Sequence, residues 1–257
     1  MVDKSHDLYS SDTYWEMHSS MFGEDADWKV RKLIAFLHDF DIAAFGNPIT
    51  ELDIGGGSGI ILKELSAHLL DKGVKSKKNA LDISPLALRA QQQNNPDMER
   101  IFCEDINKTS LKDKEIDLVL MIDVLEHIPQ PTQALKELKR ISKYVIFKVP
   151  LEHNFWYEIT DLIQRGKFRK NNIEIVGHIN KYDLNSLKSQ IEKHCGKIIK
   201  LEFTNYPQYA QIRAHSLQMG IRQKLPYLVA SYIFRVSPRL CSFVFLDFAL
   251  LLVKCYQ

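Results

Sequence analysis

Cysteine is scarce in this 257-residue sequence, and its four copies are far apart. Cys103, Cys195, Cys241 and Cys255 are separated by 92, 46 and 14 positions. No pair has the short spacing of a zinc site, and the set does not form the framework of a small disulfide-rich domain. We therefore predict no metal site and expect the protein to work in a reducing cytoplasm.

Long hydrophobic runs are also missing. The most apolar stretch, residues 240–253, has 14 residues and contains Asp247, whereas a transmembrane helix needs roughly 20 apolar residues. We expect this stretch to form a buried strand and the approach to it. The first residues, MVDKSHDLYSSD, are polar and lack the apolar core of a secretory signal.

Neither sign of charge dominates the composition. Lys and Arg number 34, while Asp and Glu number 32, so the formal net charge is +2. This balance argues against a nucleic-acid-binding protein, which usually carries a strong positive field. The hydrophobic content of 45% and the charged content of 26% are typical of a soluble globular domain. The length suits one large α/β domain or a core domain with a cap.

Apolar segments rich in β-formers alternate with amphipathic helical segments over the first 150 residues. Ser84 followed by Pro85 is a typical helix start, and so is Pro131. The alternation of strands and helices predicts βαβ units and a mainly parallel sheet. The expected strands cover residues 49–54, 79–83, 100–105, 115–123 and 143–150.

The pattern changes after the fifth expected strand. Residues 151–181 form a long connection that is rich in aromatic and basic side chains. A helix is expected from Asp183, which can cap it, to Gly196, and a sixth strand is expected at 197–206. Residues 207–240 are predicted to be a partly helical insertion before a last strand.

The first expected strand ends in an acid and opens into a glycine-rich loop, DIGGGSG, at residues 53–59. Such a loop places backbone N–H groups and the positive end of a helix dipole beside a ligand, and glycine lets the ligand approach closely. The GxGxxG pattern of NAD-binding proteins fails, because its third glycine would fall on Ile60 or Leu62. The pattern acid-x-G-x-G-x-G fits Asp53, Gly55, Gly57 and Gly59.

This loop resembles motif I of the class I S-adenosylmethionine (SAM)-dependent methyltransferases. The later strand ends agree with that family in order: LDIS at Asp82, CEDI at Asp105, then DLVLMIDVLEHIP and YVIFKVP. The resemblance covers about residues 45–205. It implies a Rossmann-like α/β fold with a seven-stranded, mostly parallel sheet, an antiparallel last strand, helices on both faces and a helical cap.

The resemblance also implies a domain organisation. Residues 1–44 would be an N-terminal helical lid segment. Residues 45–257 would be the methyltransferase domain, with cap insertions at about 151–181 and 207–240.

The same resemblance assigns a SAM contact to successive strand ends. Asp82 would bind the ribose hydroxyls, since a carboxylate can accept both hydroxyl protons. Asp105 would face the adenine amino group, with Ile106 beside the ring. A single acid after a strand is more often a solvated loop residue, but several in succession favour binding. The predicted cofactor contacts are Asp53, Gly55, Gly56, Gly57, Gly59, Asp82, Ile83, Asp105, Ile106 and Asp123.

Two histidines are candidates for activating the methyl acceptor. In IDVLEHIP, Glu126 and His127 follow the fourth expected strand, where related methyltransferases line the methionine end of SAM. His127 can act as a base near neutral pH, or the Glu–His pair can brace the loop. His178, in VGHINKYD, resembles a position in a subset of bacterial methyltransferases that act on small metabolites and surface-sugar precursors. It is a candidate base or substrate ligand, and capping the next helix is the alternative.

Candidate acceptor contacts lie in the predicted lid and cap. RGKFRK, at residues 165–170, is either a phosphate-binding cluster or a solvated helix end. The aromatic N-terminal segment is either a lid over SAM or part of the core. The predicted substrate contacts are Tyr14, Trp15, His18, Glu152, His153, Arg165, Arg169 and Tyr182.

The sequence thus predicts SAM-dependent methyl transfer to an oxygen of a small polar metabolite, with S-adenosylhomocysteine as product. A phosphorylated or sugar-like precursor of a surface polysaccharide or natural product would suit. An N-methyltransferase of a small amine is the alternative. A methyltransferase of nucleic-acid bases would need an Asn/Asp-Pro-Pro-aromatic loop where this chain has DVLEHIP. A non-catalytic partner of another enzyme would be expected to have a broken glycine loop. The oligomeric state is not predicted.

The stretch LPYLVASYIF is apolar and has cations on both sides, which leaves two interpretations open. It can lie on a bilayer and serve a lipid-linked acceptor. It can instead form the substrate cap between the last two strands, which we favour. The flanking cations are Arg222, Lys224, Arg235 and Arg239.

Overall fold

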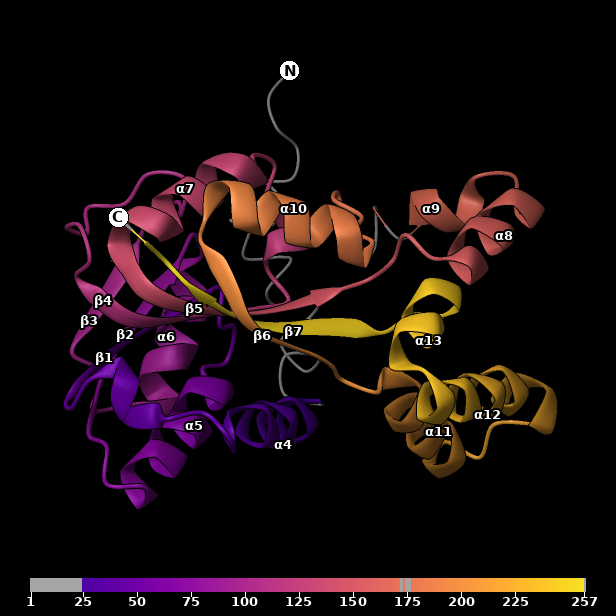
Figure 1. Cartoon of the computed structure of the whole chain (residues 1–257), viewed down its shortest axis with the longest axis horizontal. Helices are drawn as coiled ribbons and strands as arrows, with labels where there is room; N and C mark the ends of the chain where they lie inside the picture. Colours follow the sequence, from indigo (N-terminus) through magenta and orange to yellow (C-terminus); the bar gives the residue numbers. More distant parts are fainter. Residues whose placement is uncertain (1–24, 172, 174–176, 257) are drawn as a thin grey trace.

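The strands form one seven-stranded sheet of order β3-β2-β1-β4-β5-β7-β6 (Figure 1). The computed structural model describes residues 25–171, 173 and 177–256. Strands β1 to β5 run parallel, and β7 is antiparallel to both of its neighbours, β5 and β6. This topology confirms the predicted fold class. The strands are β1 (Ile49–Ile54), β2 (Ser76–Asp82), β3 (Arg100–Cys103), β4 (Ile116–Ile122), β5 (Ser142–Pro150), β6 (Lys197–Phe203) and β7 (Phe248–Lys254).

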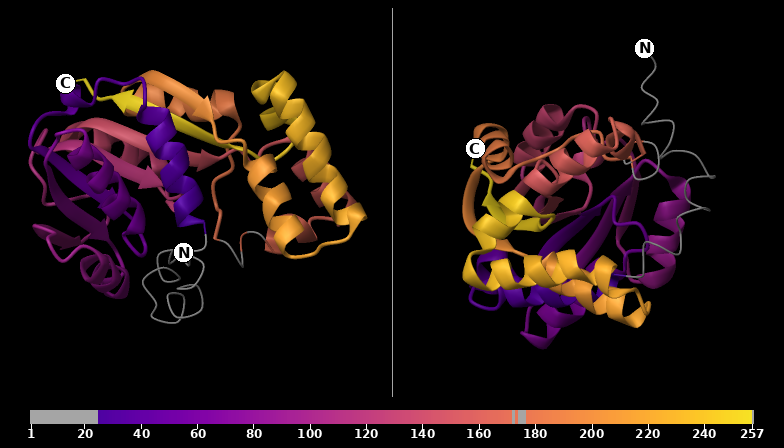
Figure 2. Two further views of the ribbon diagram at one scale, coloured as in Figure 1. Left: turned by 90° about the horizontal axis from the view of Figure 1, so that it is seen from below. Right: turned by 90° about the vertical axis from the view of Figure 1, so that its right-hand side faces the viewer.

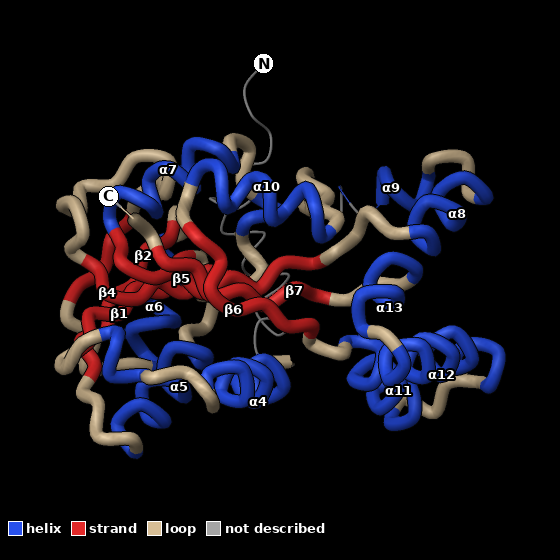
Figure 3. Tube along the Cα trace, in the orientation of Figure 1, coloured by secondary structure: helices blue, strands red, loops and turns tan. Residues whose placement is uncertain are grey.

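Helices cover both faces of the sheet, because the central strands are apolar on both sides. Along β4, Leu118 and Leu120 pack into one core cluster while Val119 and Met121 pack into the other, as the two-residue period of a strand requires. Figure 3 shows α4 and α5 against one face and α7 and α10 against the other. These helices are α4 (Ala26–Leu37), α5 (Ile60–Asp71), α7 (Pro131–Ile141) and α10 (Leu184–His194).

Two predicted helix starts are confirmed by their caps. The Ser84 hydroxyl accepts a hydrogen bond from the Ala87 backbone N–H at 3.3 Å, and Pro85 opens α6 (Pro85–Asn94). The Asp183 carboxylate accepts from the backbone N–H groups at the start of α10. Side-chain acceptors at these positions satisfy N–H groups that have no partner within the helix.

A helical cap lies beyond the carboxyl end of β5 (Figures 1 and 2). Its helices lie in two stretches of the chain, residues 155–171 and 206–244. Part of the apolar run at 240–253 is helical rather than extended, because Ser237 caps a helix that Pro238 opens. The cap helices are α8 (Phe155–Ile163), α9 (Lys167–Asn171), α11 (Tyr206–Ser216), α12 (Ile221–Val236) and α13 (Pro238–Val244).

Two short 3-10 turns complete the described secondary structure: η1 (Ile42–Phe45) leads into β1, and η2 (Leu125–His127) follows β4. Within the described part of the chain, no helix combines the length and the apolar character needed to span a membrane.

Candidate active site

The glycine loop joins β1 to α5 at the carboxyl edge of the sheet. Gly59 has a φ of 72°, a conformation that side chains disfavour, and it stands at the N-terminus of α5. A Cβ on Gly56 would collide with the Asp53 carboxylate. A Cβ on Gly55 would lie 2.8 Å from Val124, so this loop touches the segment that follows β4.

The Asp53 carboxylate fits a ligand that donates hydrogen bonds. It is buried, and its Oδ2 has no hydrogen-bond partner among the described residues. Burial, reinforced by the charges of Asp82 and Glu51, raises the pKa of Asp53 to about 7. SAM presents an ammonium, ribose hydroxyls and an adenine amino group as donors, so an unsatisfied acid beside this loop is compatible with it.

Two more of the predicted cofactor acids, Asp82 and Asp105, continue along the same edge of the sheet. Asp82 ends β2 and accepts from the Ser84 backbone N–H at 2.9 Å. Burial raises the pKa of Asp82 to about 6. Asp105, just after β3, accepts from the backbone and side chain of Asn107 at 2.8 and 2.9 Å. Ile106 is buried in the core, and Ile83 is half-buried. The assigned contacts stay predictions, but the fold aligns them along adjacent strands.

Asp123 is held in a different environment from the other predicted cofactor acids. It follows β4 with a φ of 56°, and its Oδ2 lies 2.9 Å from Lys29 of α4 and 2.8 Å from Lys148 of β5. Burial opposes ionisation, but the two ammonium groups outweigh it and hold the pKa of Asp123 below its usual range. Asp123 therefore ties α4 to the sheet.

Lys29 and Lys148 were not among the predicted site residues. Lys148 is 2% exposed, and its ammonium lies 3.5 Å from the centre of the Phe248 ring. The sequence did contain a signal for Lys148, because it is the one cation inside the apolar run YVIFKVP. A cation in a central strand needs a partner, and the acid at the end of the neighbouring strand supplies it.

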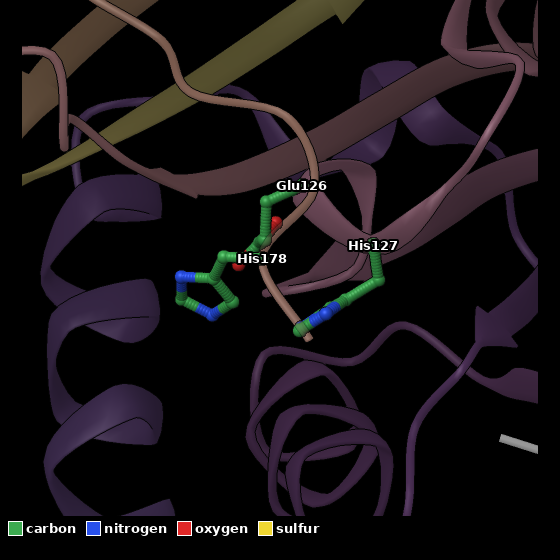
Figure 4. A group of neighbouring side chains, drawn as sticks. All are labelled: Glu126, His127 and His178. Carbon is green, nitrogen blue, oxygen red and sulfur yellow. The ribbon is translucent and has the colours of Figure 1, made fainter. Parts of the chain in front are cut away.

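Glu126, His127 and His178 come together at the end of β4 (Figure 4). The two imidazole rings belong to distant segments, yet their centroids are 4.8 Å apart. The backbone N–H groups of Ile179 and Asn180 bond to the Glu126 carbonyl oxygen at 3.1 and 2.9 Å. These bonds hold the segment around His178 against η2.

Acceptors outside the group fix the orientation of both rings. Nδ1 of His127 lies 3.1 Å from the Gly177 carbonyl oxygen, and Nδ1 of His178 lies 2.7 Å from Oε1 of Glu152. A carbonyl oxygen and a carboxylate can only accept, so each Nδ1 carries the hydrogen. In the neutral rings, Nε2 therefore holds the lone pair. Glu152, which was predicted to be a substrate contact, thus orients the His178 ring.

Electrostatics separates the protonation states within this group. Burial, with the neighbouring His178, lowers the pKa of His127 to about 3, so His127 is neutral at physiological pH. Burial and the charge of Asp123 raise the pKa of Glu126 to about 8. For His178 burial acts the other way, but the bond to Glu152 prevails and raises its pKa above the ordinary value. Neutral imidazoles can accept a proton or ligate a metal.

The remaining predicted substrate contacts are spread more widely. His153 is exposed and turns toward Asp183, 3.6 Å away. Arg169 is already paired with Glu158 at 2.9 Å and lies 3.5 Å from Asp161, whereas Arg165 is exposed. Tyr182 is buried, and its hydroxyl has no hydrogen-bond partner in the described structure. Tyr14, Trp15 and His18 lie outside the described residues.

The sheet topology and the glycine loop are those of the class I SAM-dependent methyltransferases. Residues 52–144 match the family model of a methyltransferase domain. This part of the chain is therefore a SAM-dependent methyltransferase domain. The match includes the glycine loop, the four predicted cofactor acids and the segment with Glu126 and His127.

The curated relatives match over the same region. A ubiquinone biosynthesis O-methyltransferase of Coxiella burnetii is 27% identical over 93 residues. The match covers 36% of this chain and 38% of the relative, so well under half of that enzyme is represented.

Solved structures share the fold over most of the chain. Phosphoethanolamine N-methyltransferase 2 of Haemonchus contortus, in complex with phosphomonomethylethanolamine and S-adenosylhomocysteine, matches with a TM-score of 0.60 at 15% identity, over 100% of this chain and 61% of that one. Geranyl diphosphate C-methyltransferase of Streptomyces coelicolor A3(2) matches with a TM-score of 0.59 at 12% identity, over 88% and 76%. At these identities the similarity shows the fold.

Proposed function

We propose that this chain transfers the methyl group of SAM to an oxygen of a small polar metabolite. The observation that carries the proposal is the group of Glu126, His127 and His178 beside the glycine loop. The glycine loop and this group are adjacent because Gly55 packs against Val124, which lies two residues before Glu126. Cofactor and acceptor groups thus meet at the carboxyl edge of the sheet, where ligands bind in open α/β folds.

SAM supplies an activated methyl group when bound, so the chain's residues have to align the acceptor and remove its proton. Alignment alone can lower a barrier by about 7–11 kcal/mol. Proton removal adds roughly 10²–10⁴-fold. Both rings keep the lone pair on Nε2, but His178 is the stronger base, since the bond to Glu152 raises its pKa whereas burial lowers the pKa of His127.

Oxygen is the acceptor atom we favour, because a hydroxyl needs deprotonation whereas a neutral amine already has a lone pair. The curated relative in ubiquinone biosynthesis is named as an O-methyltransferase, which supports the same choice. Exposed Arg165 near the cap is compatible with a phosphorylated or sugar-like acceptor. An N-methyltransferase of a small amine remains the alternative for the same fold.

The test is methyl transfer from SAM to matched small hydroxyl and amine acceptors, followed through S-adenosylhomocysteine. We expect hydroxyl compounds to be methylated. His178→Ala should lower the rate by roughly 10²–10⁴-fold, while His38→Ala, on an exposed side chain, should leave it unchanged. Preference for amines with no effect of His178→Ala would contradict the proposal.

A second candidate places the acceptor at a membrane surface, and the outer face of the cap favours it. Residues 205–246 contain no acid, while their cations are Arg213, Arg222, Lys224, Arg235 and Arg239. Along α12 the apolar side chains at positions 221, 225, 229, 232 and 236 are all exposed. Apolar residues beside cations suit an anionic lipid surface.

A further inference from the structure

The Glu126 carboxylate is fully buried, and both of its oxygens lack a hydrogen-bond partner among the described residues. Buried polar groups are normally satisfied, and an exception calls for an unseen ligand or ion. The Lys148 ammonium, whose charge also acts on Glu126, is already bound to Asp123.

The atoms around Glu126 are of the kinds that bind metal ions. One ligand atom each from Glu126, His127 and His178 lies within 4.8 Å of the others. Ligands that bind a shared ion at about 2.0–2.2 Å are separated by up to twice that distance. Because the observed limit of 4.8 Å slightly exceeds that separation, the side chains would have to move closer for one ion to contact all three. Figure 4 shows the side chains of Glu126, His127 and His178 gathered in one group.

The surroundings of the two rings support the same conclusion. Each ring donates its Nδ1 hydrogen to an acceptor outside the group, His127 to Gly177 and His178 to Glu152. Metal-binding histidines almost always have such an outer acceptor, which fixes the ring and raises the basicity of the nitrogen that binds the metal. A hydrogen bond to a carboxylate also makes the imidazole a stronger ligand.

We propose that Glu126, His127 and His178 bind a divalent cation of the zinc class. Two imidazoles and one carboxylate suit zinc better than magnesium or calcium, which prefer oxygen ligands. Three protein ligands leave a fourth position open for an exogenous oxygen. Asp123 is not a ligand, because Lys29 and Lys148 occupy it.

The role of the cation rests on the proposed function. An acceptor hydroxyl in the open position would become more acidic, since a bound cation stabilises the oxyanion. Its proton passes to water as the new oxygen–methyl bond forms and the sulfur–methyl bond of SAM breaks, leaving the thioether of S-adenosylhomocysteine. His178 then acts as a ligand of the activating ion.

The test is calorimetric titration of the chelator-stripped chain with Zn²⁺, with Co²⁺ as a spectroscopic probe of the coordination shell. We expect one Zn²⁺ per chain, much weaker binding of Mg²⁺, and a visible Co²⁺ spectrum that Zn²⁺ abolishes. Glu126→Gln and His178→Ala should weaken Zn²⁺ binding at least about tenfold. His38→Ala is the control with an imidazole removed elsewhere. SAM binding, measured in parallel, should persist in every variant and shows that each is folded.

Two results would overturn the metal site. One is the absence of stoichiometric Zn²⁺ binding, and the other is binding that Glu126→Gln and His178→Ala leave unchanged. The outcome is separable from the proposed function. If metal-free protein transfers the methyl group, the proposed role of the cation is wrong but the proposed function stands. If these ligands bind Zn²⁺ but no hydroxyl compound is methylated, the metal site stands but the proposed function is wrong.

Discussion

Asp123 and Glu126 stand three positions apart in one segment, and their surroundings give them opposite properties. Two ammonium groups surround Asp123 and keep it ionised. Glu126 has no such partner in the described structure, and burial raises its pKa to about 8. The first acid therefore serves the fold, while the second is available to a ligand. Sequence spacing alone could not separate them, because the lysines that decide the matter come from α4 and β5.

At the ribose position, Asp82→Ala should weaken SAM binding. A lost hydrogen bond to a charged group costs about 1.5–3 kcal/mol, which corresponds to roughly ten- to hundredfold in affinity. Calorimetry with SAM measures the change. Asp113→Ala is the control, since that exposed acid pairs with Arg140 on another part of the surface. If Asp82→Ala binds SAM as tightly as the wild type, Asp82 does not bind the ribose.

The Glu152–His178 pair predicts the pH dependence of methyl transfer. His178 has to be unprotonated to accept a proton or to bind a cation, so the rate should fall as the pH drops through its raised pKa. Glu152→Gln removes the charge that raises this pKa. We expect the acidic limb of the pH–rate profile to move to lower pH in that variant and to stay in place in His38→Ala. If the acidic limb has the same position in Glu152→Gln, a group other than His178 controls the rate at low pH.

At the scale of elements, the strands and many helix starts could be predicted because their causes are local. β1 has the predicted bounds, and α6, α7 and α10 begin where Ser84, Pro131 and Asp183 indicated. The same Ser-Pro signal at Ser237 and Pro238 opens α13, although the apolar composition of 240–253 suggested a strand. A cap on the preceding residue outweighed β-propensity there.

The candidate site was harder to predict than the elements that carry it. Both histidines were identified as candidates, but their proximity depends on hydrogen bonds from Ile179 and Asn180 to the Glu126 carbonyl. Such bonds join backbone groups, so they do not depend on particular residue types and cannot be predicted from the sequence. The cap helices posed the same difficulty, because the packing of α11, α12 and α13 depends on one another rather than on local pattern.

The tie between α4, β4 and β5 gives a stability prediction. Lys148→Ala leaves the Asp123 carboxylate with one cation fewer in a buried place, and breaking a buried pair in this way costs about 3–5 kcal/mol. Denaturant unfolding should show this loss. Lys143→Ala is the matched control, since Lys143 also lies on β5 and pairs with Asp117 but is half exposed. It should cost less than about 1 kcal/mol. Equal losses would contradict the assigned role of Lys148.

At the scale of the whole molecule, exposed apolar side chains are concentrated on the cap. On α12 only Ala230 is buried, while the exposed stripe contains Leu225, Val229 and Tyr232. A helix whose apolar face points outward normally meets a partner. The cations beside the stripe are compatible with an anionic lipid surface, which is the partner that the second candidate function proposes.

Vesicle flotation can test this surface. We expect the protein to bind vesicles that contain phosphatidylglycerol, to bind phosphatidylcholine vesicles weakly, and to be released by salt because charge contributes. Leu225→Glu combined with Tyr232→Glu should abolish binding. Leu70→Glu, which alters an exposed leucine on α5 at the other end of the molecule, should not. Self-association without lipid binding would instead identify a second copy as the occupant.

The hydrogen bonds between η2 and residues 177–180 have a consequence for protein engineering. Exchanging the cap insertions between related chains is an obvious way to alter the acceptor. In this chain, however, the insertion carries His178, while η2, which follows β4, carries Glu126 and His127. A chimera whose downstream junction falls before residue 177 would keep the native residues 177–180, whereas one whose junction falls after residue 180 would receive these residues from the donor. The position of that junction, more than the identity of the donor, decides whether the hybrid retains a working centre.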